Sequence, residues 1–267
     1  MKNKAYLQNY LRIEKEVIDF SYYITFDLFN LHTHSAYICD LILRCVSDIE
    51  SISKDIYIEC FDNNADRSRL KFDYDCINKM IEEWSLNERV LRIKEEYGLD
   101  EMSRIIRPFE KVNREGKNNF LWNFSYQALK HNKTESIQTF ANLNYLFSTL
   151  AALYLLNLYY LDVQIETTIF GFMNNEIQKS INPSLFFTFP IYKNYESIDE
   201  FATIAIGIDV PKSAVYCVNA NAEYLEKKAA YDKLDEEMKQ LDLIKQQTAR
   251  NELSATYKIS LNKKTLN

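Results

Sequence analysis

The apolar and polar positions of residues 36–58 repeat with the period of a helix. Apolar side chains recur at every third or fourth position from Ile38 to Ile52, and charged side chains such as Arg44 occupy the opposite face. This pattern is typical of an amphipathic helix whose apolar side faces a core. Ser35 precedes the apolar stripe and is predicted to cap the helix.

The most apolar stretch of the chain covers residues 140–161. A membrane-spanning helix requires about 20 mostly apolar residues, but Asn142, Asn144 and Asn157 interrupt this stretch and are costly in hydrocarbon. We therefore expect a buried core helix at the centre of the fold and no membrane span. The same periodicity predicts further helices over residues 10–31, 75–84 and 122–131.

The character of the sequence changes after residue 162. Residues 163–217 hold three of the four prolines and two runs that favour strands, 185–189 and 214–218. Beyond residue 219 the helical spacing returns and continues to about residue 253. The sequence thus predicts a mainly α protein built as an antiparallel helical bundle. Its expected parts are a bundle over residues 1–162, a mixed strand and loop extension over 163–217, and a C-terminal amphipathic helix with a tail over 218–267.

Composition narrows the class of protein. Only 4 glycines and 4 prolines are present, too few for the frequent turns of an all-β sandwich or barrel. The net charge of −6 argues against a broad basic face that wraps duplex DNA, although it leaves a local basic groove open. The five cysteines include no C-x-x-C pair, and the N-terminus lacks the apolar core of a signal peptide. We expect a cytoplasmic protein with reduced thiols.

Several common site motifs are absent from the sequence. It contains no phosphate-binding loop, no G-x-G-x-x-G, no G-x-S-x-G and no H-E-x-x-H. His32 and His34 lie two residues apart in a break between helices, where a polar loop is favoured over a metal site. We therefore expect neither a cofactor nor a metal ion.

The end of the predicted helix 122–131 carries the candidate chemistry. His131 lies between Lys130 and Lys133. A neutral imidazole can take the proton of a ribose 2′-hydroxyl, its protonated form can return one to the leaving oxygen, and nearby cations can stabilise the phosphorane charge. The alternative is that these three side chains cap the helix C-terminus and interact with its dipole. Spacing alone favours the alternative.

The same region resembles a bacterial branch of the HEPN superfamily. Its members carry a W…YNxVKHxR signature before a helix ending in LNALAALYxL, and this chain has Trp122, YQALKHNK over residues 126–133 and LAALYLL over residues 150–156. Helix 35–54 resembles the first long core helix of that branch, with Asp48 at an acidic position. The resemblance covers residues 35–162.

This resemblance implies an antiparallel bundle that forms a homodimer. In active members, two histidines and two arginines meet across the dimer as a metal-independent endoribonuclease, and such proteins occur in toxin–antitoxin and phage-defence systems. His131 carries over, and Gln127 matches the polar position that follows the family's arginine. The arginine itself, which in the family is separated from the histidine by four to six residues, is replaced by an aromatic residue or a serine at residues 124–126.

The sequence therefore leaves three functional hypotheses. The first is a metal-independent endoribonuclease in which His131 and Lys130 are catalytic. Its candidate RNA-binding residues are Gln127, Asn132, Lys133 and Arg44. The second is a non-catalytic dimerising module that binds RNA or a partner protein, the latter through the C-terminal helix. The third is a helical scaffold whose C-terminal helix pairs with another chain.

Overall fold

The computed structural model describes residues 4–162, 165–170, 182–193, 209–220 and 254–263, with single positions between 222 and 229. The α-helices are α1 (Ala5–Phe20), α2 (Ala36–Cys60), α3 (Ile77–Trp84), α4 (Leu121–His131), α5 (Lys133–Phe140), α6 (Leu143–Leu161) and α9 (Val210–Ser213). The strands are β1 (Leu91–Ile93), β2 (Ile105–Ile106), β3 (Lys111–Arg114), β4 (Lys117–Phe120), β5 (Ile165–Phe170), β6 (Phe187–Thr188), β7 (Ile191–Lys193), β8 (Tyr216–Ala220) and β9 (Ser254–Leu261). Short 3-10 or π turns cover Asn30–His32, Phe72–Cys76, Leu86–Glu88 and Glu95–Tyr97.

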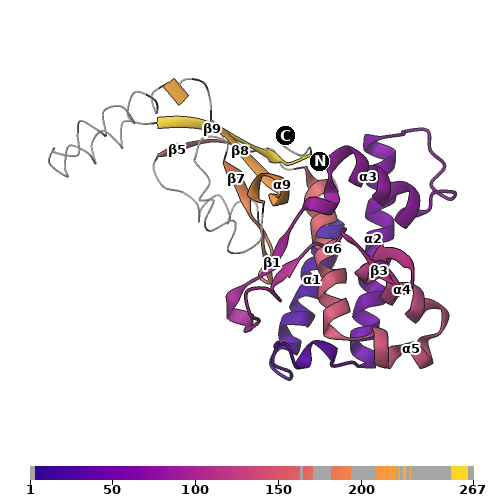
Figure 1. The fold of residues 1–267 in the computed structure, drawn as a ribbon. Helices are drawn as coiled ribbons and strands as arrows, with labels where there is room; N and C mark the ends of the chain where they lie inside the picture. Colours follow the sequence, from indigo (N-terminus) through magenta and orange to yellow (C-terminus); the bar gives the residue numbers. More distant parts are fainter. Residues whose placement is uncertain are drawn as a thin grey trace.

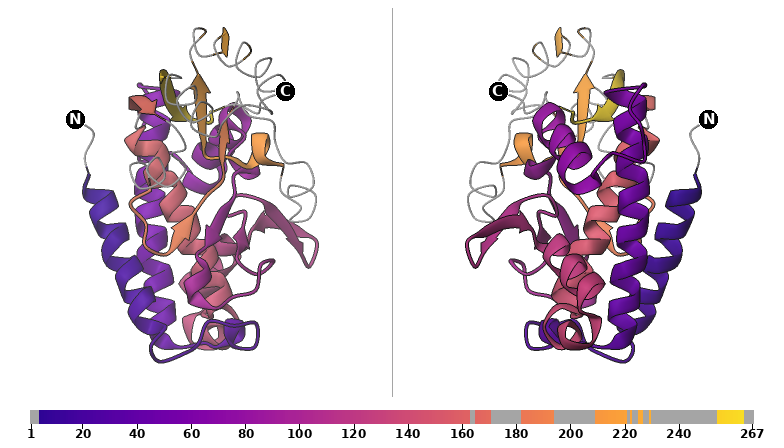
Figure 2. Two further views of the ribbon diagram at one scale, coloured as in Figure 1. Left: turned by 90° about the vertical axis from the view of Figure 1, so that its left-hand side faces the viewer. Right: turned by 90° about the vertical axis from the view of Figure 1, so that its right-hand side faces the viewer.

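Helices α1, α2 and α6 pack side by side and form the main helical layer (Figure 1). Helix α1 lies at the outer edge of this layer, and α4 packs against both α2 and α6 (Figure 2). The chain segments at one end of the layer are joined by backbone hydrogen bonds, since the amide of Ser35 donates to Ala141 over 3.2 Å and that of Leu143 donates to Thr33 over 3.3 Å. The connection between α1 and α2 therefore lies beside the connection between α5 and α6.

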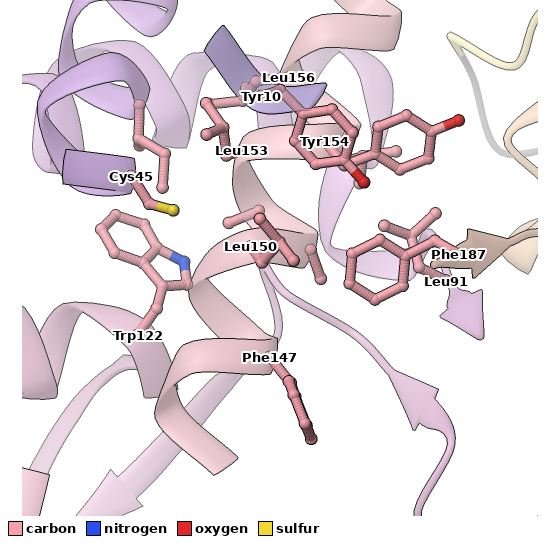
Figure 3. Packing of buried hydrophobic residues seen from close by; sticks show 14 of the residues in the cluster. Tyr10, Cys45, Leu91, Trp122, Phe147, Leu150, Leu153, Tyr154, Leu156 and Phe187 are labelled. Carbon is pink, nitrogen blue, oxygen red and sulfur yellow. The ribbon is translucent and has the colours of Figure 1, made fainter. Parts of the chain in front are cut away.

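Helix α6 is the core of the protein, as its apolar sequence predicts. It is buried along nearly its whole length and on every side, so it has no solvent-facing stripe. Trp122 and Cys45 lie on one side of it, while Leu91 and Phe187 lie on the other (Figure 3). No helix of the described residues is long and apolar enough to cross a membrane.

The starts of α2 and α6 are fixed by side chains. The Ser35 hydroxyl accepts a hydrogen bond from the amide of Ile38 over 3.0 Å, which confirms the predicted cap of α2. The Asn142 side chain accepts from the amide of Tyr145 over 3.2 Å and so caps α6. The predicted helix 122–131 is also confirmed, as α4. Asp75, which opens the helix predicted over 75–84, instead lies within the π turn and accepts a hydrogen bond from the amide of Lys71.

In the described part of the chain, three sheets accompany the helices. Strand β1 is the middle strand of the antiparallel order β2-β1-β6, and β3 and β4 form a separate hairpin. The third sheet has the order β5-β9-β8-β7, in which only the β7–β8 pair is parallel. The strands expected within 185–189 and 214–218 are present as β6 and β8.

The expectation of a mainly α antiparallel bundle is wrong, because the described residues form a mixed structure of helices and three sheets. The physical reason lies in α6. The helices cover only part of its apolar surface, and the β2-β1-β6 sheet covers another part: the ring of Phe187 stacks on that of Tyr154, with 5.9 Å between the ring centroids. Strand β1 lies inside residues 87–97, which the sequence presents as a charged segment.

The expectation of a C-terminal helix and tail over residues 218–267 is partly wrong. Residues 216–220 and 254–261 are strands β8 and β9, which pair with each other. Their side chains include the buried Val218 and Ile259, which belong to the same apolar core as α6. Most of residues 221–253, where the amphipathic helix is expected, lie outside the described residues.

A buried carboxylate links α1 to the segment before β6. Glu14 is 1% exposed and accepts hydrogen bonds from the hydroxyls of Tyr10, over 2.6 Å, and of Ser184. The amides of Leu185 and Phe186 donate to it over 3.1 Å each. These four donors satisfy a charge that is otherwise costly to bury, so the segment is held against the helical layer.

A buried guanidinium links the C-terminal sheet to the helices. Arg89 is 0% exposed, and its Nε donates to the Tyr159 hydroxyl over 3.1 Å and to the carbonyl oxygen of Asn262 over 3.2 Å. Its terminal nitrogens donate to the carbonyl oxygens of Lys212 and Trp84. One side chain thus joins α3, α6, α9 and the end of β9.

Replacing Arg89 with alanine is expected to destabilise the protein strongly. The change leaves buried carbonyl oxygens without donors and opens a cavity, which together cost about 3 kcal/mol or more. Urea denaturation followed by far-UV circular dichroism measures the free energy of unfolding. The matched control is Arg12→Ala, since Arg12 is exposed and has no hydrogen-bond or ion-pair partner among the described residues. An Arg89→Ala variant as stable as Arg12→Ala contradicts the role assigned to the buried guanidinium.

Candidate functional site

The junction of α4 and α5 consists of residues 130–133, which are all exposed. His131 is the last residue of α4, Asn132 separates the helices, and Lys133 is the first residue of α5. The Asn132 side chain donates to the carboxylate of Glu135 in the first turn of α5. The His131 imidazole has no hydrogen-bond or ion-pair partner among the described residues. We refer to Lys130, His131 and Lys133 as the basic corner.

The two lysines of the basic corner have different surroundings. The Lys130 ammonium lies over the ring of Tyr126, 5.2 Å from its centroid, in a cation–π contact. Lys133 lies near the start of α2, where its charge acts on the thiol of Cys39: burial raises the pKa of that thiol, and the Lys133 ammonium lowers it in part. Neither lysine has a carboxylate within ion-pair distance among the described residues, so both ammonium groups are open to an anion.

Gln127 does not join the basic corner. Its side chain is half-buried and lies 3.4 Å from the Asn123 side chain, to which it donates. Asn123 is itself buried and donates to Asp73 over 3.0 Å. Gln127 therefore belongs to a chain of polar contacts that connects α4 to the turn before α3.

Arg44 lies elsewhere, on the face of α2 that meets α1. Its guanidinium donates to both oxygens of Glu16, over 2.6 and 2.9 Å, and lies 3.4 Å from Asp40. This pair lowers the pKa of Glu16 and raises the pKa of Arg44. The two charges neutralise each other locally. Because Arg44 is held against α1 whereas His131 ends α4, the structure does not bring Arg44 to His131.

Arg44 lines a pocket of about 330 Å³ between α1 and α2. Its lining residues are Asn9, Arg12, Ile13, Arg44, Ser47 and Asp48, and none comes from α4 or α5. Burial raises the pKa of Asp48, while the Asn9 side chain and Arg44 act in the opposite direction. Asp48, the acidic residue that the resemblance expects at this position, therefore lines this pocket and is not part of the basic corner.

A further basic residue approaches α4 from the β3–β4 hairpin. Arg114 is the last residue of β3, and its guanidinium carbon lies 5.9 Å from the ring centroid of Phe124 on α4. The sequence pattern does not single out Arg114, because its ring contacts join side chains that are distant in sequence. The available signal was the hairpin turn itself: Glu115 and Gly116 both have positive φ, 52° and 78°, as the two central residues of a type I′ turn require.

The histidine pair lies in the segment just before α2. His32 ends a 3-10 turn and His34 forms an isolated bridge with Asn142, and both are exposed. Across the described part of the chain, no group of three His, Cys, Asp or Glu side chains is placed to hold a metal ion.

No family model, curated protein or solved structure shows a significant match to this chain. Its candidate chemistry therefore follows from the geometry and charge of its own residues.

Proposed function

We propose that the chain binds single-stranded RNA through the basic corner. The main support is the distribution of charge: residues 110–135 contain five basic and three acidic residues, a local excess of positive charge, whereas the whole chain carries −6. The basic residues are Lys111, Arg114, Lys117, Lys130 and Lys133. A local excess of positive charge on an acidic protein attracts a phosphate backbone to that one region.

The side chains around the basic corner support a single strand over a duplex. Phe124 and Tyr126 are half-buried on α4, and each ring has a cation over it, Arg114 and Lys130 respectively. Proteins bind single strands by combining cations that hold the phosphates with aromatic rings on which unpaired bases stack. A duplex offers no unpaired bases to such rings.

Replacing both lysines with glutamine, Lys130→Gln with Lys133→Gln, is expected to weaken RNA binding about tenfold or more at low salt. Log K falls as log salt rises, and each phosphate contact contributes about 0.7 to the steepness of that fall for a single strand. The slope of the double variant is therefore expected to be shallower by about 1.4. Fluorescence anisotropy with a labelled oligouridine measures both the affinity and the slope.

The control for this change is Lys15→Gln, because Lys15 is exposed on α1, on a helix that packs against α2 and α6 and not against α4. Loss of binding in the control, or an unchanged salt slope in the double variant, contradicts the proposal. If the wild-type chain binds no RNA, the hypothesis of a non-catalytic module that binds a partner protein takes its place.

RNA cleavage is a second candidate function, favoured by the exposed imidazole of His131 between two ammonium groups that have no carboxylate partner among the described residues. In this reaction His131 takes the proton of a ribose 2′-hydroxyl while the 2′-oxygen attacks phosphorus. The bond from phosphorus to the 5′-oxygen then breaks, and the protonated His131 returns the proton to that oxygen. Lys130 and Lys133 stabilise the negative charge that develops on the phosphorane. The products are a 2′,3′-cyclic phosphate and a 5′-hydroxyl.

His131→Ala is expected to reduce this cleavage by at least about a hundredfold, the usual contribution of a general acid or base. Wild-type cleavage is expected to persist in EDTA. A denaturing gel of end-labelled RNA gives the rates, and circular dichroism shows whether the variant is folded. Equal cleavage by the folded variant and the wild type rejects a catalytic role for His131 and leaves binding as the function.

Membership of the HEPN superfamily remains a proposal, and so do homodimerisation and a role in phage defence or as a toxin. A dimer is supported by the exposed aromatic side chains in the turn after α1. Tyr22 is 84% exposed, Tyr23 82% and Phe29 94%. Apolar surface of this kind is typical of protein interfaces, and the molar mass from light scattering tests whether a second copy covers it.

A further inference from the structure

We propose that Arg114 and the aromatic rings around it form a second subsite, which binds a phosphodiester of the same RNA strand. The inference rests on the proposed function, because the basic corner anchors the strand. It extends that function by assigning a ligand to a side chain on the β3–β4 hairpin, outside α4 and α5.

Three helices supply the rings that surround Arg114. Its guanidinium carbon lies 5.9 Å from the ring centroid of Phe124 on α4, 5.4 Å from that of Phe140 at the end of α5, and 5.7 Å from that of Tyr145 at the start of α6. Cation–π contacts of this kind hold the guanidinium in a fixed position. The hairpin therefore presents one cation at the meeting point of α4, α5 and α6.

The guanidinium of Arg114 has donors to spare. It forms no ion pair and no hydrogen bond with any described residue, whereas Arg44, Arg67 and Arg104 each have a carboxylate partner. Arg114 is half-buried, and none of its nitrogens is fully buried without a partner. Its guanidinium N–H groups have no acceptor among the described residues, and such groups match the oxygens of a phosphate in a bidentate arrangement.

The position of Arg114 relative to His131 fits one continuous strand. Phe124 and His131 lie seven residues apart on α4, which places them on the same face of the helix and about 10 Å apart along its axis. Because Arg114 lies over Phe124, a strand held at the basic corner reaches Arg114 by following α4 for two turns. An extended single strand carries successive phosphates along such a path.

The charge around the subsite also fits this ligand. Glu115 follows Arg114 directly and is exposed at the tip of the hairpin. Its side chain forms no ion pair with Arg114. No carboxylate of the described residues therefore neutralises Arg114, and the proposed phosphodiester supplies the anion.

Arg114→Gln tests the subsite in the full-length protein, with labelled oligouridine as the probe. The expected result is a several-fold loss of affinity at low salt and a salt slope smaller by about 0.7, the contribution of one phosphate contact. Lys15→Gln, which makes the same change of charge on α1, is expected to leave both values at those of the wild type.

A second variant separates RNA binding from a purely structural role of Arg114. Arg114→Lys keeps the charge over the rings but removes the planar donors, so the subsite predicts weaker binding with an unchanged salt slope. Wild-type affinity in both Arg114 variants, with the Lys130→Gln and Lys133→Gln double variant still impaired, overturns the subsite and leaves the proposed function standing. Absence of RNA binding in the wild type rejects both proposals together.

Discussion

Helix α6 imposes the constraint on which the rest of the structure depends. It is apolar on every side and buried along nearly its whole length, so other elements must surround it completely. Helices α1, α2 and α4 provide part of this cover, and the β2-β1-β6 sheet provides more, through residues such as Phe187. The neighbouring helices of a simple bundle can bury a helix with one apolar stripe. A helix that is apolar on every side must also be covered by segments that are distant in sequence.

Two buried charged side chains hold those distant segments in place. Glu14 gathers hydroxyl and amide donors from the segment before β6, and Arg89 donates to carbonyl oxygens near α9 and after β9. Both side chains use the polar groups of irregular backbone that would otherwise be buried without partners. The sheets are thus joined to the helical layer by directional hydrogen bonds as well as by apolar packing.

Local signals in the sequence predict the local parts of the structure. The stripe of α2, its cap at Ser35, and helices α4 and α6 follow from periodicity and capping. The sheets do not, because their pairings are long-range: Arg92 pairs with Thr188, and Cys217 with Ser260. Strands β1, β2 and β7, of two or three residues each, also carry too short an alternation to be recognised, whereas the apolar runs that contain β6 and β8 are visible in the sequence. The same limit applies to the candidate site, where the run from Lys130 to Lys133 is visible in the sequence but the ring contacts of Arg114 require the folded chain.

The functional account rests on a local reversal of charge within an acidic protein, placed on the hairpin and on α4 with its neighbouring rings. Cross-linking of a thiouridine-containing oligonucleotide, followed by mass spectrometry of the modified peptides, tests this location most directly. The account predicts cross-links within residues 111–134, with Phe124 and Tyr126 among the modified positions. Cross-links confined to other parts of the chain, such as the pocket between α1 and α2, would contradict it.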